Sequence, residues 1–184
     1  MFLRLLGLVW GATIIVLILA FNSYIGRPGE LGLPPRFWPQ LTSIPRDVER
    51  PTVVLFVDPN CPCTQATLAN LERCLARCVD LPATKIVIVR GSPGEIPRGT
   101  AQRLATLPRV EFVWDTNGNE TKRFEVKTSG EVLVFRSDGG LEFSGGITPG
   151  RGHEGDTSGM EAIVNINSGA AISHHEAHVY GCPL

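Results

Sequence analysis

Two cysteines separated by one proline are the residues of this chain best suited to chemistry. Cys61-Pro62-Cys63 follows the apolar, β-branched run Thr52–Val57 and precedes the helical periodicity of Gln65–Arg77. A cysteine at the start of a helix lies near the positive end of the helix dipole and near free backbone N–H groups, and both favour the thiolate. The pattern therefore predicts thiol–disulfide chemistry, with Cys61 as the nucleophile and Cys63 as the thiol that resolves a mixed disulfide.

The same pair of thiols allows two other interpretations. Paired thiolates suit Cu(I) or another soft metal, and the chain has four histidines that could add a ligand: His153, His174, His175 and His178. Alternatively, the two cysteines are inert buried thiols. Apart from copper under the first of these alternatives, no cofactor is expected, and no metal-ligand set is assigned.

The remaining three cysteines leave the disulfide pattern open. Cys74 and Cys78 are four residues apart, so they share one face of the predicted helix. Cys182 lies two residues from the end and could pair with any of the others. Because the chain has five cysteines, at least one thiol is unpaired or exchanges partners.

Regular patterns on both sides of the cysteines predict the elements that position them. The helix lies between two strand-like apolar runs, Thr52–Val57 and Lys85–Val89, which is the pattern of a parallel β-α-β unit. A hairpin is predicted further on, because Ser137-Asp138-Gly139-Gly140 separates two more strands. The other expected elements are a helix over 99–107, a strand over 110–114, helical turns over 119–126, hairpin strands over 131–135 and 141–144, and a closing helix over 157–170. This order predicts an α/β three-layer sandwich with a mixed sheet.

An uncharged apolar run near the N-terminus predicts one transmembrane helix. The segment from Leu5 to Ile25 contains no charged residue and, at about 1.5 Å per residue, is long enough to cross a hydrocarbon core of about 30 Å. A cleaved signal peptide is the alternative, but the run is longer than the usual signal core and lacks a small-x-small cleavage site. We therefore expect a membrane anchor over 1–26, a proline-rich linker over 27–51 and a folded domain over 52–184.

Charge and cysteine content indicate the compartment and the partners. With 17 basic and 18 acidic residues, the chain lacks the positive charge that nucleic-acid binding needs. Five cysteines attached to an anchor fit an oxidising compartment, which favours a single-pass membrane protein whose main domain is extracytoplasmic, in the periplasm. The expected partners are membrane lipid around the anchor and either a protein thiol or disulfide client or the subunits of a membrane complex.

Three segments carry a resemblance to a known family. VVLFVDPNCPCTQATLANL, KTSGEVLVFRSDGGLEFSGGI and GRGHEGD resemble the thioredoxin-like superfamily and, more narrowly, the membrane-anchored bacterial RedB-like proteins, over about residues 36–184. The resemblance implies a thioredoxin-like fold with a redox-active cysteine pair. It also implies that the GRGHEGD stretch packs near the cysteines, with His153 as a proton partner, although a loop that only caps the hairpin is an equal alternative.

The chain departs from the thioredoxin pattern at two positions. Thioredoxins have two residues between the cysteines, whereas one residue here would make a strained disulfide that is easier to reduce, and hence an oxidising or isomerising protein. Thioredoxins also have a cis-proline before the penultimate strand that presents backbone to the substrate; here the same place holds Thr128, Ser129 and Gly130. These three residues are candidates for substrate binding, or form a plain turn into the strand. A non-catalytic subunit that kept the fold is the remaining hypothesis.

Overall fold

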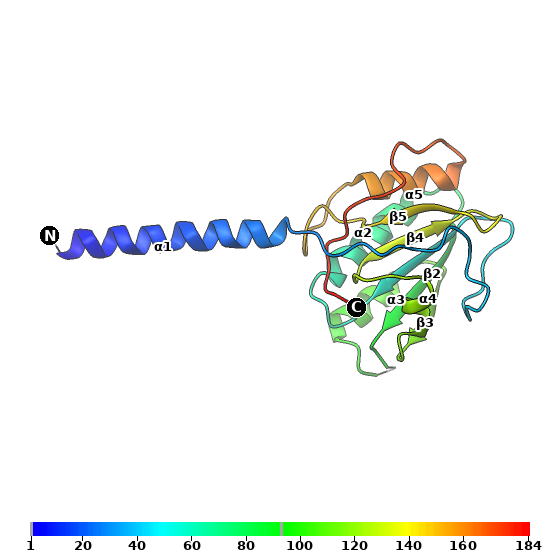
Figure 1. Cartoon of the computed structure of the whole chain (residues 1–184), viewed down its shortest axis with the longest axis horizontal. Coiled ribbons are helices and arrows are strands. Elements are labelled where there is room, and N and C mark those ends of the chain that lie inside the picture. The colour runs from blue at the N-terminus through cyan, green and yellow to red at the C-terminus, as the bar shows by residue number, and fades with distance from the viewer. Residues whose placement is uncertain (1, 93) are drawn as a thin grey trace.

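The computed structural model describes residues 2–92 and 94–184, and its elements follow the order expected from the sequence (Figure 1). The helix expected over 119–126 is shorter than predicted, and the closing helix ends where Gly169 takes a positive φ of 74°. The helices are α1 (Phe2–Ile25), α2 (Thr64–Arg77), α3 (Arg98–Thr106), α4 (Asn119–Arg123) and α5 (Ser158–Ser168). The strands are β1 (Thr52–Val57), β2 (Ala83–Val89), β3 (Val110–Asp115), β4 (Glu131–Phe135) and β5 (Leu141–Gly145).

The five strands form one mixed sheet in the order β3-β2-β1-β4-β5. β1, β2 and β3 are parallel, whereas β4 runs antiparallel to β1, and β5 antiparallel to β4. β1 is therefore central, and all six of its residues are buried, which explains why its sequence is continuously apolar rather than alternating. The carboxyl end of this central strand leads directly into the cysteine motif.

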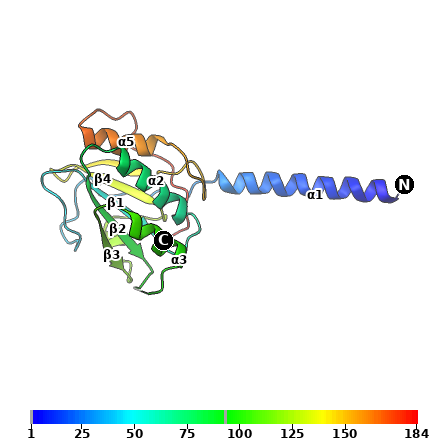
Figure 2. The same ribbon diagram turned by 180° about the vertical axis from the view of Figure 1, so that it is seen from behind.

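Helices cover one face of the sheet and irregular segments cover most of the other. Figure 2 shows α2, α3 and α5 together on one face, where their apolar side chains and those of alternate strand residues form one core cluster. On the opposite face, β1, β2 and β4 contribute a second cluster that α4 and its following turn close through Phe124 and Val126. A β-α-β unit followed by an antiparallel hairpin and a closing helix is the thioredoxin-like arrangement, so the expected fold class is confirmed.

The proline-rich segment 27–51 has no helix or strand, as its prolines predict, but it lies against the domain. The ring of Trp38 packs edge-on at 5.3 Å from Phe124 and 5.0 Å from Phe135, measured between ring centroids. Ile44 is buried in the same cluster. The boundary expected at residue 52 stays a prediction; the structure adds that Trp38 and Ile44 complete the second core face.

The helix α1 extends away from the domain (Figure 1). Its segment Leu6–Ile25 has a mean hydropathy of 2.0 and is not buried by the rest of the chain, so it is long and apolar enough to cross a membrane. The end of α1 nearest the domain contacts the loop that contains Arg151. The guanidinium of Arg151 lies 5.1 Å from the centroid of the Tyr24 ring, and the amide of Arg151 donates to the carbonyl of Ile25 at 3.1 Å.

The packing of Trp38 predicts a measurable contribution to stability. Trp38→Ala removes an aromatic side chain from the second core cluster, and we expect it to lower the free energy of unfolding by about 2 kcal/mol because the indole is half-buried. Phe37→Ala is the matched control, since Phe37 is 70% exposed and its loss should change stability little. Chemical denaturation of the full chain in detergent checks both; equal effects of the two substitutions would show that Trp38 does not belong to the core.

Candidate active site

The cysteine motif lies in a hydrogen-bonded turn between β1 and α2. The amide of Cys61 donates to the carbonyl of Asp58 at 3.1 Å, and the Thr64 hydroxyl donates to the same carbonyl at 2.7 Å. Cys63 is the N-cap residue of α2, and its carbonyl accepts from the amide of Thr67 at 3.2 Å. Both cysteines lie where the sequence predicts them, at the positive end of the helix dipole. The chain covers them, leaving 4% of Cys61 and 7% of Cys63 exposed.

A third cysteine meets this pair from the end of the chain. The Sγ atom of Cys182 lies 2.6 Å from the Sγ atom of Cys61, across 121 positions of sequence. The sequence left the partner of Cys182 open, and the structure brings it to the predicted nucleophile. Three sulfur-bearing side chains therefore meet at the carboxyl end of β1.

The loop Thr128-Ser129-Gly130 also reaches the cysteine turn. The Ser129 hydroxyl accepts from the amide of Asp58 at 2.9 Å, and the amide of Gly130 donates to the carbonyl of Phe56 at 2.8 Å. Gly130 takes a positive φ of 94°, which a side chain would strain. The described chain contains no cis peptide bond, so this loop differs from the thioredoxin pattern in conformation as well as sequence. Its role in substrate binding stays a prediction.

Burial raises the pKa of two of the three thiols at the site. For Cys63, burial acts first and the neighbouring Cys61 second, and together they raise its pKa. Burial and the hydrogen bond with Cys61 raise the pKa of Cys182 to about 12. At neutral pH the reduced forms of Cys63 and Cys182 therefore keep their protons.

Arg151 is a site residue that the sequence reasoning missed. Its Nη1 atom donates to the carbonyl of Gly181 at 2.5 Å, next to Cys182, and its positive charge opposes the rise in the pKa of Cys63 and of Cys182. The sequence feature that could have indicated it is the GRGHEGD stretch, in which Arg151 lies two residues before His153. His153 is exposed, and its Nδ1 atom lies 2.8 Å from the carbonyl oxygen of Arg151. Its role as a proton partner stays a prediction.

Cys74 and Cys78 lie near the other end of α2, but the helix ends at Arg77, so Cys78 follows it with an extended backbone rather than sharing a helix face with Cys74 as predicted. Cys74 is fully buried in the core beside α5, with its sulfur 3.6 Å from the carbonyl oxygen of Met160. Cys78 caps the end of the helix, and its sulfur lies 3.5 Å from the carbonyl oxygen of Cys74. Hydrogen bonding between the two thiols raises the pKa of Cys74 and lowers that of Cys78.

The histidines near the C-terminus do not form a metal-binding cluster among the residues that the structure describes. Among residues 2–92 and 94–184, no group of three or more histidine, cysteine or acidic side chains is arranged to hold a metal ion. His175 lies 2.9 Å from the carbonyl oxygen of Glu142 through its Nδ1 atom. Copper binding at Cys61 and Cys63 stays a prediction.

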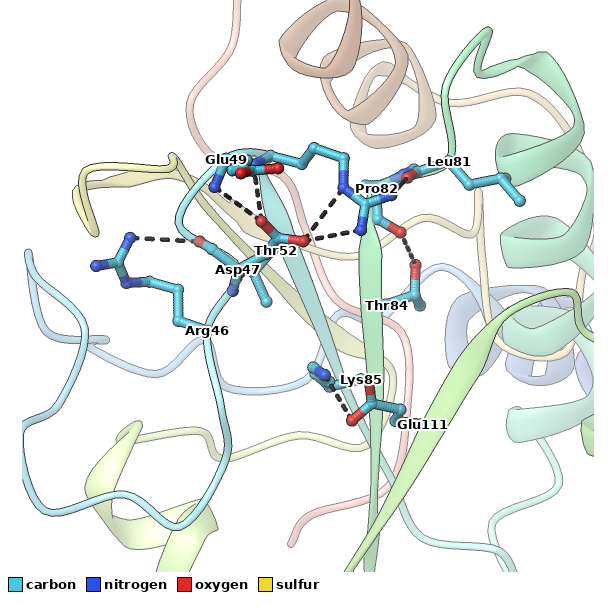
Figure 3. Close-up of polar contacts among 10 residues, drawn as sticks. Arg46, Asp47, Glu49, Thr52, Leu81, Pro82, Thr84, Lys85 and Glu111 are labelled. Carbon is cyan, nitrogen blue, oxygen red and sulfur yellow. Dashed lines mark hydrogen bonds and ion pairs between the residues drawn. The ribbon is translucent and has the colours of Figure 1, made fainter.

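A hollow of about 490 Å³ lies at the opposite end of the sheet from the cysteines, beside the beginnings of β2 and β3. Four of its charged side chains pair with one another (Figure 3): Nη2 of Arg50 lies 2.9 Å from Asp47, and Nζ of Lys85 lies 2.6 Å from Glu111. Arg46 and Arg109 also line the hollow, and neither is in an ion pair among the described residues. Because no cysteine or histidine lines the hollow, the cysteine end of β1 remains the candidate site for thiol chemistry.

Two solved structures with TM-scores above 0.5 share the fold of this chain, and neither indicates its chemistry. No family model matches the chain, and no curated protein matches it. An uncharacterised conserved protein from Geobacillus kaustophilus aligns with a TM-score of 0.59 and 14% identity over 86% of this chain and 92% of its own. A hypothetical protein from Sinorhizobium meliloti 1021 aligns with a TM-score of 0.60 and 12% identity over 87% and 96%. A secreted Mycobacterium tuberculosis disulfide oxidoreductase homologous to E. coli DsbE aligns with a TM-score of 0.42 and 19% identity over 50% and 66%.

A buried carboxyl lies directly after the Thr128–Gly130 loop. Glu131 begins β4 and is fully buried, where the Ser144 hydroxyl lies 3.4 Å from its Oε1 atom and the Lys127 amide donates to Oε2 at 3.4 Å. Burial outweighs these hydrogen bonds and raises its pKa from 4.5 to about 7. The folded chain therefore keeps this proton at pH values where the unfolded chain has released it.

This raised pKa predicts a pH-dependent stability with a defined sign. The contribution of the neutral Glu131 is fully present below its unfolded pKa of 4.5 and is lost as the pH rises through about 7. We expect the free energy of unfolding to fall by about 3 kcal/mol more in the wild type than in Glu131→Gln across this window. Urea titrations at about pH 4.5 and about pH 8 measure the difference. Glu49→Gln, at an exposed position, is the control, and a wild type that keeps the pH profile of Glu131→Gln would contradict the assignment.

Proposed function

We propose that the chain is a membrane-tethered thiol–disulfide oxidoreductase or isomerase-like protein that works on the extracytoplasmic side and uses Cys61 as its reactive thiol. The observation that carries the proposal is the meeting of Cys61, Cys63 and Cys182 at the carboxyl end of β1 and the start of α2. A thiol at a helix N-terminus with a second thiol in reach is what reversible disulfide exchange requires.

The exchange has two steps. The Cys61 thiolate attacks one sulfur of a client disulfide, so that a Cys61–client mixed disulfide forms and the other client sulfur leaves as a thiolate. A second thiol of the chain then attacks the Cys61 sulfur and releases the client's remaining sulfur. The client gains two electrons and two protons, while two thiols of the chain become one disulfide. The reverse sequence oxidises a client dithiol, and the relative reduction potentials decide the direction.

The fold and the anchor support this assignment. The thioredoxin-like arrangement places the thiols at the end of a buried strand, and the apolar helix α1 can hold the domain at a membrane. The client would be a protein thiol or disulfide, and membrane lipid would surround α1. The narrower resemblance to the RedB-like proteins and the periplasmic orientation remain part of the proposal.

Thiol exchange with oxidised glutathione tests the proposal. The reduced full chain in detergent micelles should convert oxidised to reduced glutathione and gain one internal disulfide. Reduced dithiothreitol added afterwards should reduce that internal disulfide back to two thiols. Cys61→Ser should abolish the formation of this disulfide, because it removes the attacking sulfur. The readouts are reduced glutathione, measured enzymatically, and the mass of the chain after alkylation.

Cys78→Ser is the matched control, because Cys78 lies at the other end of α2 and should not affect the exchange. A Cys61→Ser protein that reacts as fast as the wild type would overturn the proposed function.

A further inference from the structure

We propose that the C-terminal tail, residues 179–184, is a built-in strand that occupies the place of a client, and that Cys182 on this tail, rather than Cys63, closes the disulfide with Cys61. The inference rests on the proposed function, since it names the second thiol of the exchange. It makes Cys63 a third thiol of the site rather than the resolving one.

Backbone hydrogen bonds hold the tail in an extended path across the site. The Val179 carbonyl accepts from the amide of Gly29 at 2.7 Å, and the Cys182 carbonyl accepts from the amide of Ser129 at 2.8 Å. At the end of the chain, the amide of Leu184 donates to the carbonyl of Lys127 at 2.8 Å. The bonds of Cys182 and Leu184, on either side of Pro183, are those of a short antiparallel bridge in which Pro183 pairs with Thr128.

Next to Cys182, the tail backbone approaches the Thr128–Gly130 loop too closely for a side chain at Gly181. A Cβ atom on Gly181 would lie 1.7 Å from the carbonyl oxygen of Ser129, so only glycine allows the tail to approach the loop. Gly146 faces the start of the tail in the same way, because a Cβ atom there would lie 2.9 Å from the Cα atom of Val179. Glycines on both surfaces let the backbones touch, and the position of the Cys182 sulfur follows from that contact.

The tail uses the backbone groups that an extended client would need. A peptide that presents a cysteine to Cys61 from this side would pair its backbone with the Ser129 amide, as strand addition to an open edge does. Cys182 already makes that hydrogen bond and places its sulfur 2.6 Å from that of Cys61. A client must therefore displace the tail to reach Cys61, and the tail must return while the client sulfur is still bonded to Cys61, so that Cys182 can attack.

The state of Cys61 controls when Cys182 can react. Before exchange, the hydrogen bond with Cys61 contributes to the raised pKa of Cys182. When Cys61 is bonded to a client sulfur, it carries no charge and that contribution is lost. Once the tail has returned to the site, Arg151 again lies beside Gly181 and lowers the pKa of Cys182. Cys182 then loses its proton more readily and attacks the Cys61 sulfur. The Cys61–client bond breaks, its electron pair leaves with the client sulfur, and the Cys61–Cys182 disulfide forms.

Peptide mapping after a timed reaction with oxidised glutathione tests the pairing. In the full chain in detergent, we expect the disulfide to link the peptides that contain Cys61 and Cys182. In Cys182→Ser, the Cys61–glutathione adduct should persist at least about tenfold longer than in the wild type, because the nearby attacking thiol is gone. Cys78→Ser, at the other end of α2, is the matched control and should close its disulfide at the wild-type rate. In Cys63→Ser the link between Cys61 and Cys182 should still form, and a persistent glutathione adduct in this variant would assign the closure to Cys63.

A glycine substitution tests the tail without removing a sulfur. Gly181→Ala keeps all three thiols but pushes the tail from Ser129, so it should also slow the closure; Gly99→Ala on α3 is its control. Closure at the wild-type rate in Cys182→Ser would overturn the inference and leave the proposed function intact. The absence of any adduct on Cys61 in every variant would instead overturn the proposed function.

Discussion

Ser129 connects the segments that bring the sulfur atoms together. Its hydroxyl accepts from the amide of Asp58 in the turn that precedes Cys61, and its own amide donates to the carbonyl of Cys182. One buried residue at the entrance to β4 thus fixes both the cysteine turn and the tail. Because buried polar groups need partners, losing either contact would leave an unsatisfied group in the interior. The geometry of the site therefore depends on this loop as much as on the cysteine motif.

The elements that the sequence predicts well are those whose signals are local. The apolar run of β1, the periodicity of α2 and the turn residues between β4 and β5 each act within a few positions, and they define the mixed sheet and the placement of Cys61. The cysteine pair could be found for the same reason, since its position between a buried strand and a helix is visible in the sequence.

Contacts between distant, irregular segments could not be predicted in this way. The meeting of Cys61 with Cys182 depends on the path of the tail, which has no periodicity and no element of its own. Trp38 presents the same difficulty, because an aromatic residue among prolines gives no indication of which face of a sheet it covers. The GRGHEGD stretch indicates His153 rather than Arg151, because histidine has the more familiar proton chemistry.

The two faces of the sheet are covered in different ways. The helical face is built from regular elements and supplies most of the core, whereas the other face is closed by the segment around Trp38 and Ile44 and by the turn after α4. The 27–51 segment connects α1 to β1, and the amide of Gly29 in this segment donates a hydrogen bond to the carbonyl of Val179 in the tail. Stability and the placement of the tail thus depend partly on a segment that has no secondary structure.

The contacts of Arg151 connect the cysteine site to the end of the apolar helix α1. The same side chain lies over the Tyr24 ring at the end of α1 and donates to the carbonyl of Gly181 beside Cys182. With α1 in a bilayer, the Gly181 end of the tail, next to Cys182, would therefore lie near the headgroups. Under the proposed function, a client cysteine close to the membrane surface would then have the shortest path to the site.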